Sequence, residues 1–182
     1  MSVGLIPHVT NLHMVHLINY GRGHIYGTCV REIMADKLLS EEINQQLRGI
    51  FNSELKHSVE IVYFSKKEQC YSCEEIHFLL DEIISASDKL HFSNYDLDEY
   101  PALAQQYHVE LAPCLVIAGR DGNKLLDYGI RFNGIPSGFE FSSLIQDIVI
   151  VSKRDSGLRP ETRGQLHKIS GPIHLKVFVT PT

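Results

Sequence analysis

The chain has 182 residues, which is enough for one domain with a proper hydrophobic core and some extensions. Its 43% hydrophobic and 21% charged residues are typical of a globular protein, and they exclude a disordered or fibrous chain. The net charge of -5, with Lys and Arg scattered, leaves no basic field for phosphate backbones, so we expect no nucleic-acid partner. Since the sequence has neither a membrane-length apolar run nor a signal-peptide pattern, we also expect no membrane association and a location in the cytoplasm.

The first 33 residues differ in character from the rest of the chain. They contain four histidines but a single carboxylate side chain, Glu32, and they show no sustained helical or strand period. Two interpretations stay open. Residues 1–33 are either a translated leader before a biological start at Met34, or a genuine but poorly ordered extension.

The next part of the chain alternates between helical and strand patterns. Residues 35–43 begin an amphipathic helix with acidic early turns, and residues 59–64 (VEIVYF) predict a mostly buried strand. Apolar residues then recur at helical spacing between Ile76 and Ile84. This periodicity predicts a helix over residues 70–87, with Cys70 and Cys73 in its first turn.

Another strand and helix follow, at residues 90–96 and 99–107. A strand–helix–strand–helix order implies parallel pairing of the two strands, because parallel neighbours need a crossover connection. The pattern then changes to two apolar runs, 115–118 and 125–132, separated by turn residues at 120–123. These runs predict an antiparallel hairpin.

The last part of the predicted core unit is a helix that closes near Ser152. Ser137 and Glu140 have the spacing of a capping box for this helix. A polar stretch from residue 153 resembles a linker, and a short helical segment ends at about Ile169. Residues 173–179 alternate between apolar and polar as a strand does, and such a terminal strand needs a sheet to join.

The segment Cys70-Tyr71-Ser72-Cys73 follows a predicted strand and opens a predicted helix, which is the context of a redox C-x-x-C motif. A helix N-terminus stabilises a thiolate, so we expect Cys70 to be the nucleophile in thiol–disulfide exchange. Cys73, one helical turn further, is then expected to displace the mixed disulfide. We expect the spacer residues Tyr71 and Ser72 to contact the substrate.

The four cysteines are too few and too unevenly spaced for a secreted disulfide framework, so a catalytic or metal role is expected. Half of a zinc or iron–sulfur site is the alternative interpretation of C-x-x-C, and it requires two further ligands. The sequence contains no second C-x-x-C and no H-x-x-x-H, although Cys29, Cys114 and the scattered histidines are candidates. We therefore predict no metal.

Three further features near the motif each have a functional and a plain interpretation, and the plain one is favoured in each case. Lys66 and Lys67 support the thiolate electrostatically or belong to a solvated loop. Cys114 is a third redox thiol or a small buried cysteine. His77 is a ligand or a histidine at the protein surface.

A proline begins a predicted buried strand about forty residues after the cysteines, in the segment from Val109 to Cys114. A proline at the first position of a strand is permitted in the trans form. Its position here also makes the bond before Pro113 a candidate for a cis peptide, an uncommon form in folded proteins.

The order of these elements resembles the thioredoxin and glutaredoxin fold, which is an α/β fold with a mixed central sheet flanked by helices. More specifically, residues 128–141 (YGIRFNGIPSGFEF) and 147–153 are similar to the N-terminal unit of the glutaredoxin-like protein disulfide oxidoreductases. Residues 177–182 resemble the first strand of the second unit of that family. The resemblance covers about Met34 to Thr182.

This resemblance implies two tandem units that act on protein disulfides, each with its own C-x-x-C. From the chemistry of the pair we expect no bound cofactor. The resemblance implies that Pro113 is a cis proline facing the cysteine pair, and that Ala112 offers backbone hydrogen bonds to an extended substrate. It also implies an upstream reductase as a partner. The acidic residue that thioredoxins bury beneath their cysteines would fall near Phe64, so its proton-transfer role has no obvious bearer.

The sequence departs from the family pattern because it ends where the second C-x-x-C would follow. A fragment, a frameshift or a stop codon each accounts for this, and the departure puts two-site relay or isomerase activity in doubt. The expected organisation is a leader or extension (1–33), a thioredoxin/glutaredoxin-like domain (34–152), and a linker, short helix and first strand of a truncated second unit (153–182). An unpaired apolar terminal strand is a site for homodimer formation or aggregation.

These observations predict a protein dithiol–disulfide oxidoreductase that works through Cys70 and Cys73. Two alternatives are retained. The first is a redox-inactive module that binds extended peptides along the Pro113 edge, and the second is a zinc or iron–sulfur protein that uses the C-x-x-C.

Overall fold

The structure is a computed structural model, and it describes residues 37–179 of the chain. The predicted leader or extension at residues 1–33 lies outside the described residues. Helix α1 (Glu41–Glu54) begins later than the sequence indicates, because Ser40 is its N-cap and accepts a hydrogen bond from the Ile43 N–H at 3.3 Å. Its inward face contributes Leu47 and Phe51 to the core.

Four strands form one mixed sheet in the order β2-β1-β3-β4. Strand β1 (Val59–Ser65) pairs in parallel with β2 (Leu90–Asp96), as the crossover argument predicts. Strands β3 (Cys114–Asp121) and β4 (Lys124–Asn133) form the predicted antiparallel hairpin, and β3 also pairs antiparallel with β1. The β-branched and aromatic run that predicted β1 is therefore central in the sheet and almost wholly buried.

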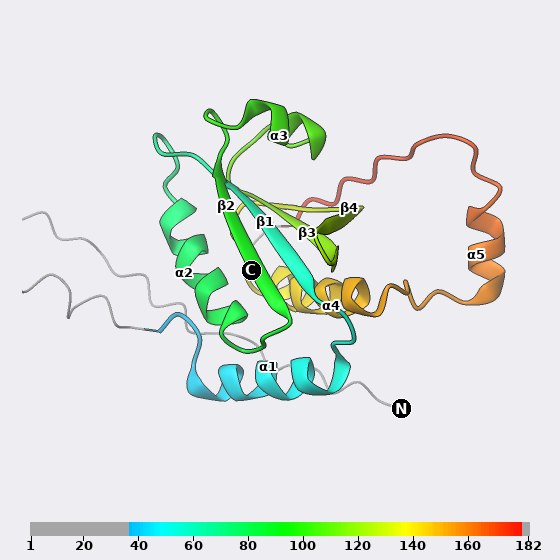
Figure 1. Cartoon of the computed structure of the whole chain (residues 1–182), viewed down its shortest axis with the longest axis horizontal. Coiled ribbons are helices and arrows are strands. Elements are labelled where there is room, and N and C mark those ends of the chain that lie inside the picture. The colour runs from blue at the N-terminus through cyan, green and yellow to red at the C-terminus, as the bar shows by residue number, and fades with distance from the viewer. Residues whose placement is uncertain (1–36, 180–182) are drawn as a thin grey trace, which may run out of the picture.

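Helices cover the two faces of this sheet unequally (Figure 1). Helices α1, α2 (Cys73–Ile84) and α4 (Phe139–Lys153) pack on one face and share its main core with β1 and β3. The short helix α3 (Pro101–Gln106) covers part of the other face, over a smaller core. Fully buried side chains such as Phe51, Ile61 and Leu144 each contribute about 1.5–3 kcal/mol through burial.

The start of α4 differs from the prediction. Its N-cap is Gly138, with φ of 56°, and no side chain caps the helix there. The predicted capping box is therefore wrong: the backbone N–H of Glu140, the second residue of α4, is bonded to the Ser137 carbonyl and not to the Ser137 side chain. A glycine is suited to this position because other residues rarely adopt a positive φ.

The segment after α4 does not join the sheet. Helix α5 (Pro160–Leu166) forms within the predicted helical segment, but it buries no residue and stands apart from the sheet (Figure 1). The predicted strand at residues 173–179 is wrong, since these residues form no strand and their side chains are exposed. A strand is stabilised by pairing, and no strand of the described sheet pairs with this segment.

Within residues 37–179, no helix combines the length and apolar character that a bilayer crossing requires.

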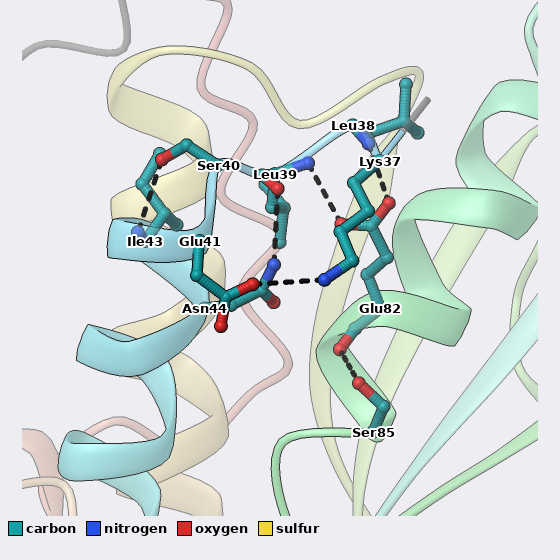
Figure 2. A network of polar contacts seen from close by, with 9 residues as sticks. All are labelled: Lys37, Leu38, Leu39, Ser40, Glu41, Ile43, Asn44, Glu82 and Ser85. Atoms are coloured by element: carbon teal, nitrogen blue, oxygen red, sulfur yellow. Dashed lines mark hydrogen bonds and ion pairs between the residues drawn. The ribbon is translucent and has the colours of Figure 1, made fainter. Parts of the chain in front are cut away.

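The chain immediately before α1 is fixed to α2 by a single carboxylate, as Figure 2 shows. Glu82 of α2 accepts hydrogen bonds from the backbone N–H groups of Leu38 at 2.6 Å and Leu39 at 2.9 Å. Leu39 is also buried in the main core. This contact explains why residues 37–39 are held against α2 and do not continue α1 toward the N-terminus.

Replacing Glu82 with alanine is expected to lower the free energy of unfolding by about 1–2 kcal/mol, because two charge-assisted hydrogen bonds to a half-buried carboxylate are lost. Urea unfolding measures the change. Lys37→Ala is the matched control, since it removes the exposed ion pair with Glu41 in the same segment and should cost less than about 0.5 kcal/mol. Equal effects of the two variants would contradict the role of Glu82.

Candidate redox site

The cysteine pair occupies the connection between β1 and α2. Cys70 and Cys73 are joined by a disulfide with a Cα–Cα distance of 5.5 Å, within the usual range for such bonds. Only Cys73 belongs to α2, where it is the first residue, so the prediction that both cysteines lie in the first helical turn is wrong for Cys70. The chain turns just before the pair at Gln69, whose φ of 58° is unusual for a residue other than glycine.

The two sulfur-bearing residues differ in exposure. Cys73 is 9% exposed and belongs to the main core, whereas Cys70 is only partly buried and packs against the edge of that core. Tyr71, between them, is fully exposed. A reaction partner therefore reaches Cys70 before Cys73.

The start of α2 has a mixed electrostatic character. The N-cap residue Ser72 makes no side-chain hydrogen bond to the helix, so the first backbone N–H groups of α2 point toward the cysteine turn without a side-chain partner from Ser72. These groups and the helix dipole favour a thiolate at Cys70. Glu74 and Glu75 in the first turn act in the opposite direction, because their negative charges disfavour a nearby thiolate.

The loop that leads to Cys70 is held by Asp96, a residue that no sequence pattern indicated. Its carboxylate accepts backbone N–H bonds from Lys67 at 2.9 Å, Asp98 at 2.9 Å and Glu99 at 3.2 Å. Burial alone would raise the pKa of Asp96, but these hydrogen bonds outweigh it and lower the pKa. The last residue of β2 thus fixes the loop before the cysteines against the chain leading to α3.

Both lysines of this loop form ion pairs. Lys66 lies 3.1 Å from Asp98, and Lys67 pairs with Glu99. The pairing with Glu99 raises the pKa of Lys67. These contacts fit the interpretation of Lys66 and Lys67 as loop residues at the surface, since their charges face carboxylates.

A shallow pocket of about 290 Å³ lies beside Cys73, between α2 and the ends of β1 and β2. His77 lines it and has two neighbours: its Nε2 is 3.7 Å from Asp81, and its ring meets that of Phe92 edge to face. His77 is thus a partly exposed histidine that lies beside the Asp81 carboxylate and the Phe92 ring. The pocket is lined by Tyr63, Ser65, Lys66, Lys67, Cys73, Glu74, His77, Phe78 and Asn94.

Pro113 lies at the same edge of the sheet as the cysteine turn. In the antiparallel pairing of β1 with β3, Phe64 faces Cys114, so Pro113 is level with the end of β1, from which the loop to Cys70 departs. The Ala112–Pro113 peptide bond is cis, which confirms that prediction. The Pro113 carbonyl accepts a hydrogen bond from the Gly134 N–H at 3.0 Å, and Ala112 is partly exposed.

Cys114 lies on the opposite face of the sheet from Cys73. It belongs to the smaller core under α3, whereas Cys73 belongs to the main core under α1, α2 and α4. Cys114 is free, 1% exposed, and its burial raises the pKa of its thiol to about 11. The favoured interpretation, a small buried cysteine, is confirmed.

In the folded, reduced protein we expect alkylation of Cys114 by iodoacetamide to be at least about 100-fold slower than alkylation of Cys70. A raised pKa leaves less thiolate at neutral pH, and burial excludes the reagent as well. Mass spectrometry of the peptides that contain Cys70 and Cys114 follows both reactions separately. Comparable rates at pH 7 would contradict the burial of Cys114, and unfolding in urea should remove the difference.

Among residues 37–179, no group of three or more His, Cys, Asp or Glu side chains is arranged to hold a metal ion. The two cysteines of the motif are bonded to each other.

Tyr63 is, after Asp96, a second residue near the pair that sequence reasoning missed. Its hydroxyl donates a hydrogen bond to the Cys73 carbonyl at 2.9 Å. In the sequence this tyrosine is one more aromatic residue of a buried strand, so no pattern singled it out.

Comparison with known proteins finds curated relatives, although no protein-family model matches the chain. The alkyl hydroperoxide reductase AhpF of Staphylococcus aureus (strain NCTC 8325) is 27% identical over 145 residues, which are 80% of this chain and 25% of that protein. A protein of Bacillus subtilis (strain 168) named NADH dehydrogenase is 25% identical over 150 residues, again 25% of its length. The chain thus spans about a quarter of these curated relatives.

Two solved structures share the fold and part of the sequence. The alkyl hydroperoxide reductase AhpF of Enterococcus faecalis has a TM-score of 0.62 and 29% identity, covering 70% of this chain and 59% of that one. The protein disulfide oxidoreductase of Aeropyrum pernix has a TM-score of 0.63 and 25% identity, covering 72% and 56%. The chain therefore has a thioredoxin-like fold with a disulfide-bonded Cys70–Cys73 pair, and it is homologous to the N-terminal domain of the alkyl hydroperoxide reductase AhpF and to protein disulfide oxidoreductase.

Proposed function

We propose that the chain exchanges its dithiol with the disulfides of protein substrates, with Cys70 as the attacking thiol and Cys73 as the resolving thiol. The observation that carries this assignment is the unequal exposure of a bonded pair. Cys70 lies in the turn before α2, partly exposed, while Cys73 is buried as the first helical residue. A substrate disulfide therefore meets the Cys70 sulfur first.

The exchange balances in two steps. The Cys70 thiolate attacks one sulfur of the substrate disulfide, the substrate S–S bond breaks, and one substrate thiolate leaves. The Cys73 thiolate then attacks the Cys70 sulfur, the intramolecular disulfide forms, and the second substrate thiolate leaves. The substrate gains two electrons, and the Cys70–Cys73 pair loses them.

Protein disulfides fit the surroundings of the pair as substrates. Tyr71 is fully exposed between the cysteines, and Leu111, directly before Ala112, is 70% exposed. These side chains offer apolar contacts to a polypeptide near the reacting sulfur. We assign substrate contacts to Tyr71, Ser72, Ala112 and Pro113, with the Ala112 backbone as a hydrogen-bonding group for an extended segment.

An upstream reductase is the second proposed partner, because the pair must regain two electrons after each turnover. The relatives whose names contain a reductase or a dehydrogenase support this proposal. We also propose a cytoplasmic location and a role in cell redox homeostasis. The division into residues 1–33, 34–152 and 153–182, and homodimer formation through the terminal segment, stay predictions.

Reduction of insulin by dithiothreitol tests the proposed function. The purified chain should accelerate the precipitation of the insulin B chain above the rate with dithiothreitol alone, and metal analysis of the same sample accompanies the assay. Lack of acceleration together with binding of an extended peptide would replace the proposal with a redox-inactive binding module. Lack of acceleration together with stoichiometric zinc or iron would replace it with a metal protein.

A further inference from the structure

Tyr63 connects the sheet to the redox turn through one buried hydrogen bond. Its side chain is 0% exposed and faces the main core from β1, with its ring centroid 6.3 Å from that of Phe92 on β2. Its hydroxyl donates to the backbone carbonyl of Cys73 at 2.9 Å. Burial of the hydroxyl strongly raises the pKa of Tyr63, so this group stays protonated and remains a donor at any physiological pH.

The carbonyl that receives this bond belongs to the first residue of α2. The N-cap residue, Ser72, contributes no side-chain hydrogen bond to the helix. The start of α2 is therefore without the usual side-chain cap, and the Tyr63 hydroxyl is a polar side-chain contact between this turn and the sheet. Tyr63 and Cys73 also line the same pocket, on the side of α2 that faces β2.

We propose that Tyr63 is a positioning residue for the exchange reaction, which holds the resolving thiol of Cys73 within reach of Cys70 while Cys70 changes its bonding partner. This inference rests on the proposed roles of the two cysteines. During exchange, Cys70 is bonded first to the substrate and then to Cys73. The second step requires that the Cys73 sulfur keep its place when no bond to Cys70 holds it.

Loss of this hydrogen bond has two expected consequences for the pair. The two thiols spend less time in the reactive geometry, so the resolution step slows, because alignment of the reacting groups sets its rate. The intramolecular disulfide also becomes less favourable relative to the dithiol, for the same reason. A single net hydrogen bond corresponds to about a two- to tenfold change in each quantity.

The test compares Tyr63→Phe with Tyr107→Phe in the full chain. Tyr107 is also a buried tyrosine, but it lies in the smaller core on the other face of the sheet. Redox buffers of reduced and oxidised dithiothreitol give the equilibrium constant of the Cys70–Cys73 disulfide, and quenched-flow trapping gives the rate at which Cys73 resolves a mixed disulfide on Cys70. Tyr63→Phe should lower both values by about two- to tenfold, and Tyr107→Phe should leave both unchanged.

Two further readouts separate positioning from a general loss of stability. Circular dichroism confirms that each variant is folded under the assay conditions, and para-aminophenylalanine at position 63 restores an N–H donor and should recover most of the lost rate. An unchanged equilibrium constant and resolution rate in Tyr63→Phe would overturn the proposal. If instead Cys70→Ser kept full exchange activity, the proposed function itself would fail, whatever Tyr63→Phe does.

Discussion

Cys70→Ser is expected to abolish catalysed disulfide exchange, reducing insulin turnover by about 1000-fold or more to the background rate of dithiothreitol. The serine hydroxyl cannot replace a thiolate as the attacking group. Cys73→Ser is expected to slow turnover as well, but for a different reason. Its Cys70 thiolate still attacks the substrate, and the mixed disulfide then accumulates because the intramolecular resolving thiol is missing and only the slower attack by dithiothreitol releases the product.

The two variants are distinguished by the adduct that each one forms. Mass spectrometry of the protein after incubation with a disulfide substrate should show a covalent mixed disulfide with Cys73→Ser and none with Cys70→Ser. Cys114→Ser is the matched control, because Cys114 lies on the other face of the sheet from Cys73. This substitution should leave turnover unchanged. Accumulation of the adduct in Cys70→Ser, with none in Cys73→Ser, would reverse the assigned roles.

Ser152→Ala is expected to lower the free energy of unfolding by about 2–3 kcal/mol, although it removes a single oxygen atom. Ser152 lies in the last turn of α4 and is 0% exposed. Its Oγ accepts the backbone N–H groups of Lys56 at 2.9 Å and His57 at 3.0 Å, and it donates to the His57 carbonyl. One hydroxyl thus bonds three backbone groups of Lys56 and His57, in the chain between α1 and β1.

The cost arises because alanine leaves the Lys56 N–H without its partner, whereas the His57 N–H keeps a hydrogen bond to the Ser152 carbonyl at 3.2 Å. Urea unfolding followed by circular dichroism measures the change. Ser143→Ala is the matched control on the same helix, since the exposed Ser143 hydroxyl donates only to the Phe139 carbonyl one turn earlier. It should cost less than about 0.5 kcal/mol, and an equally small effect of Ser152→Ala would contradict the role of the Ser152 hydroxyl.

Within the sheet, the strands were predicted more accurately than the helix starts, whereas the strand predicted at residues 173–179 does not form. Residues 90–96 form the predicted strand, and the predicted strand at residues 59–64 extends by one residue to Ser65, since the β-branched and aromatic run of β1 is almost wholly buried in the sheet. Helix starts depend on local hydrogen bonds that apolar spacing does not report. The spacing between Ile76 and Ile84 describes the packed part of α2, and it contains no information on where the turn at Gln69 ends and the helix begins.

The candidate site was also predictable only in part. The cysteine pair and the cis bond before Pro113 were predictable, because each depends on residue types at short spacing. The contacts that hold the pair were not, because they depend on how separate elements pack against each other. Asp96 at the end of β2 fixes a loop 29 residues earlier, and the Tyr63 hydroxyl on β1 reaches the Cys73 carbonyl at the start of α2.

Cys70 and Cys73 are assigned as a reversible redox pair, and a redox titration of the intact chain tests this assignment most directly. The chain is equilibrated in buffers of reduced and oxidised dithiothreitol, quenched with acid, and labelled with a maleimide for mass spectrometry of the peptides that contain the two cysteines. We expect one reversible transition in which both cysteines change from thiol to disulfide together. Its slope should be that of a two-electron couple, about 29.6 mV per tenfold change in the ratio of oxidised to reduced protein. Labelling that is independent of the buffer ratio, or two separate transitions, would contradict the assignment.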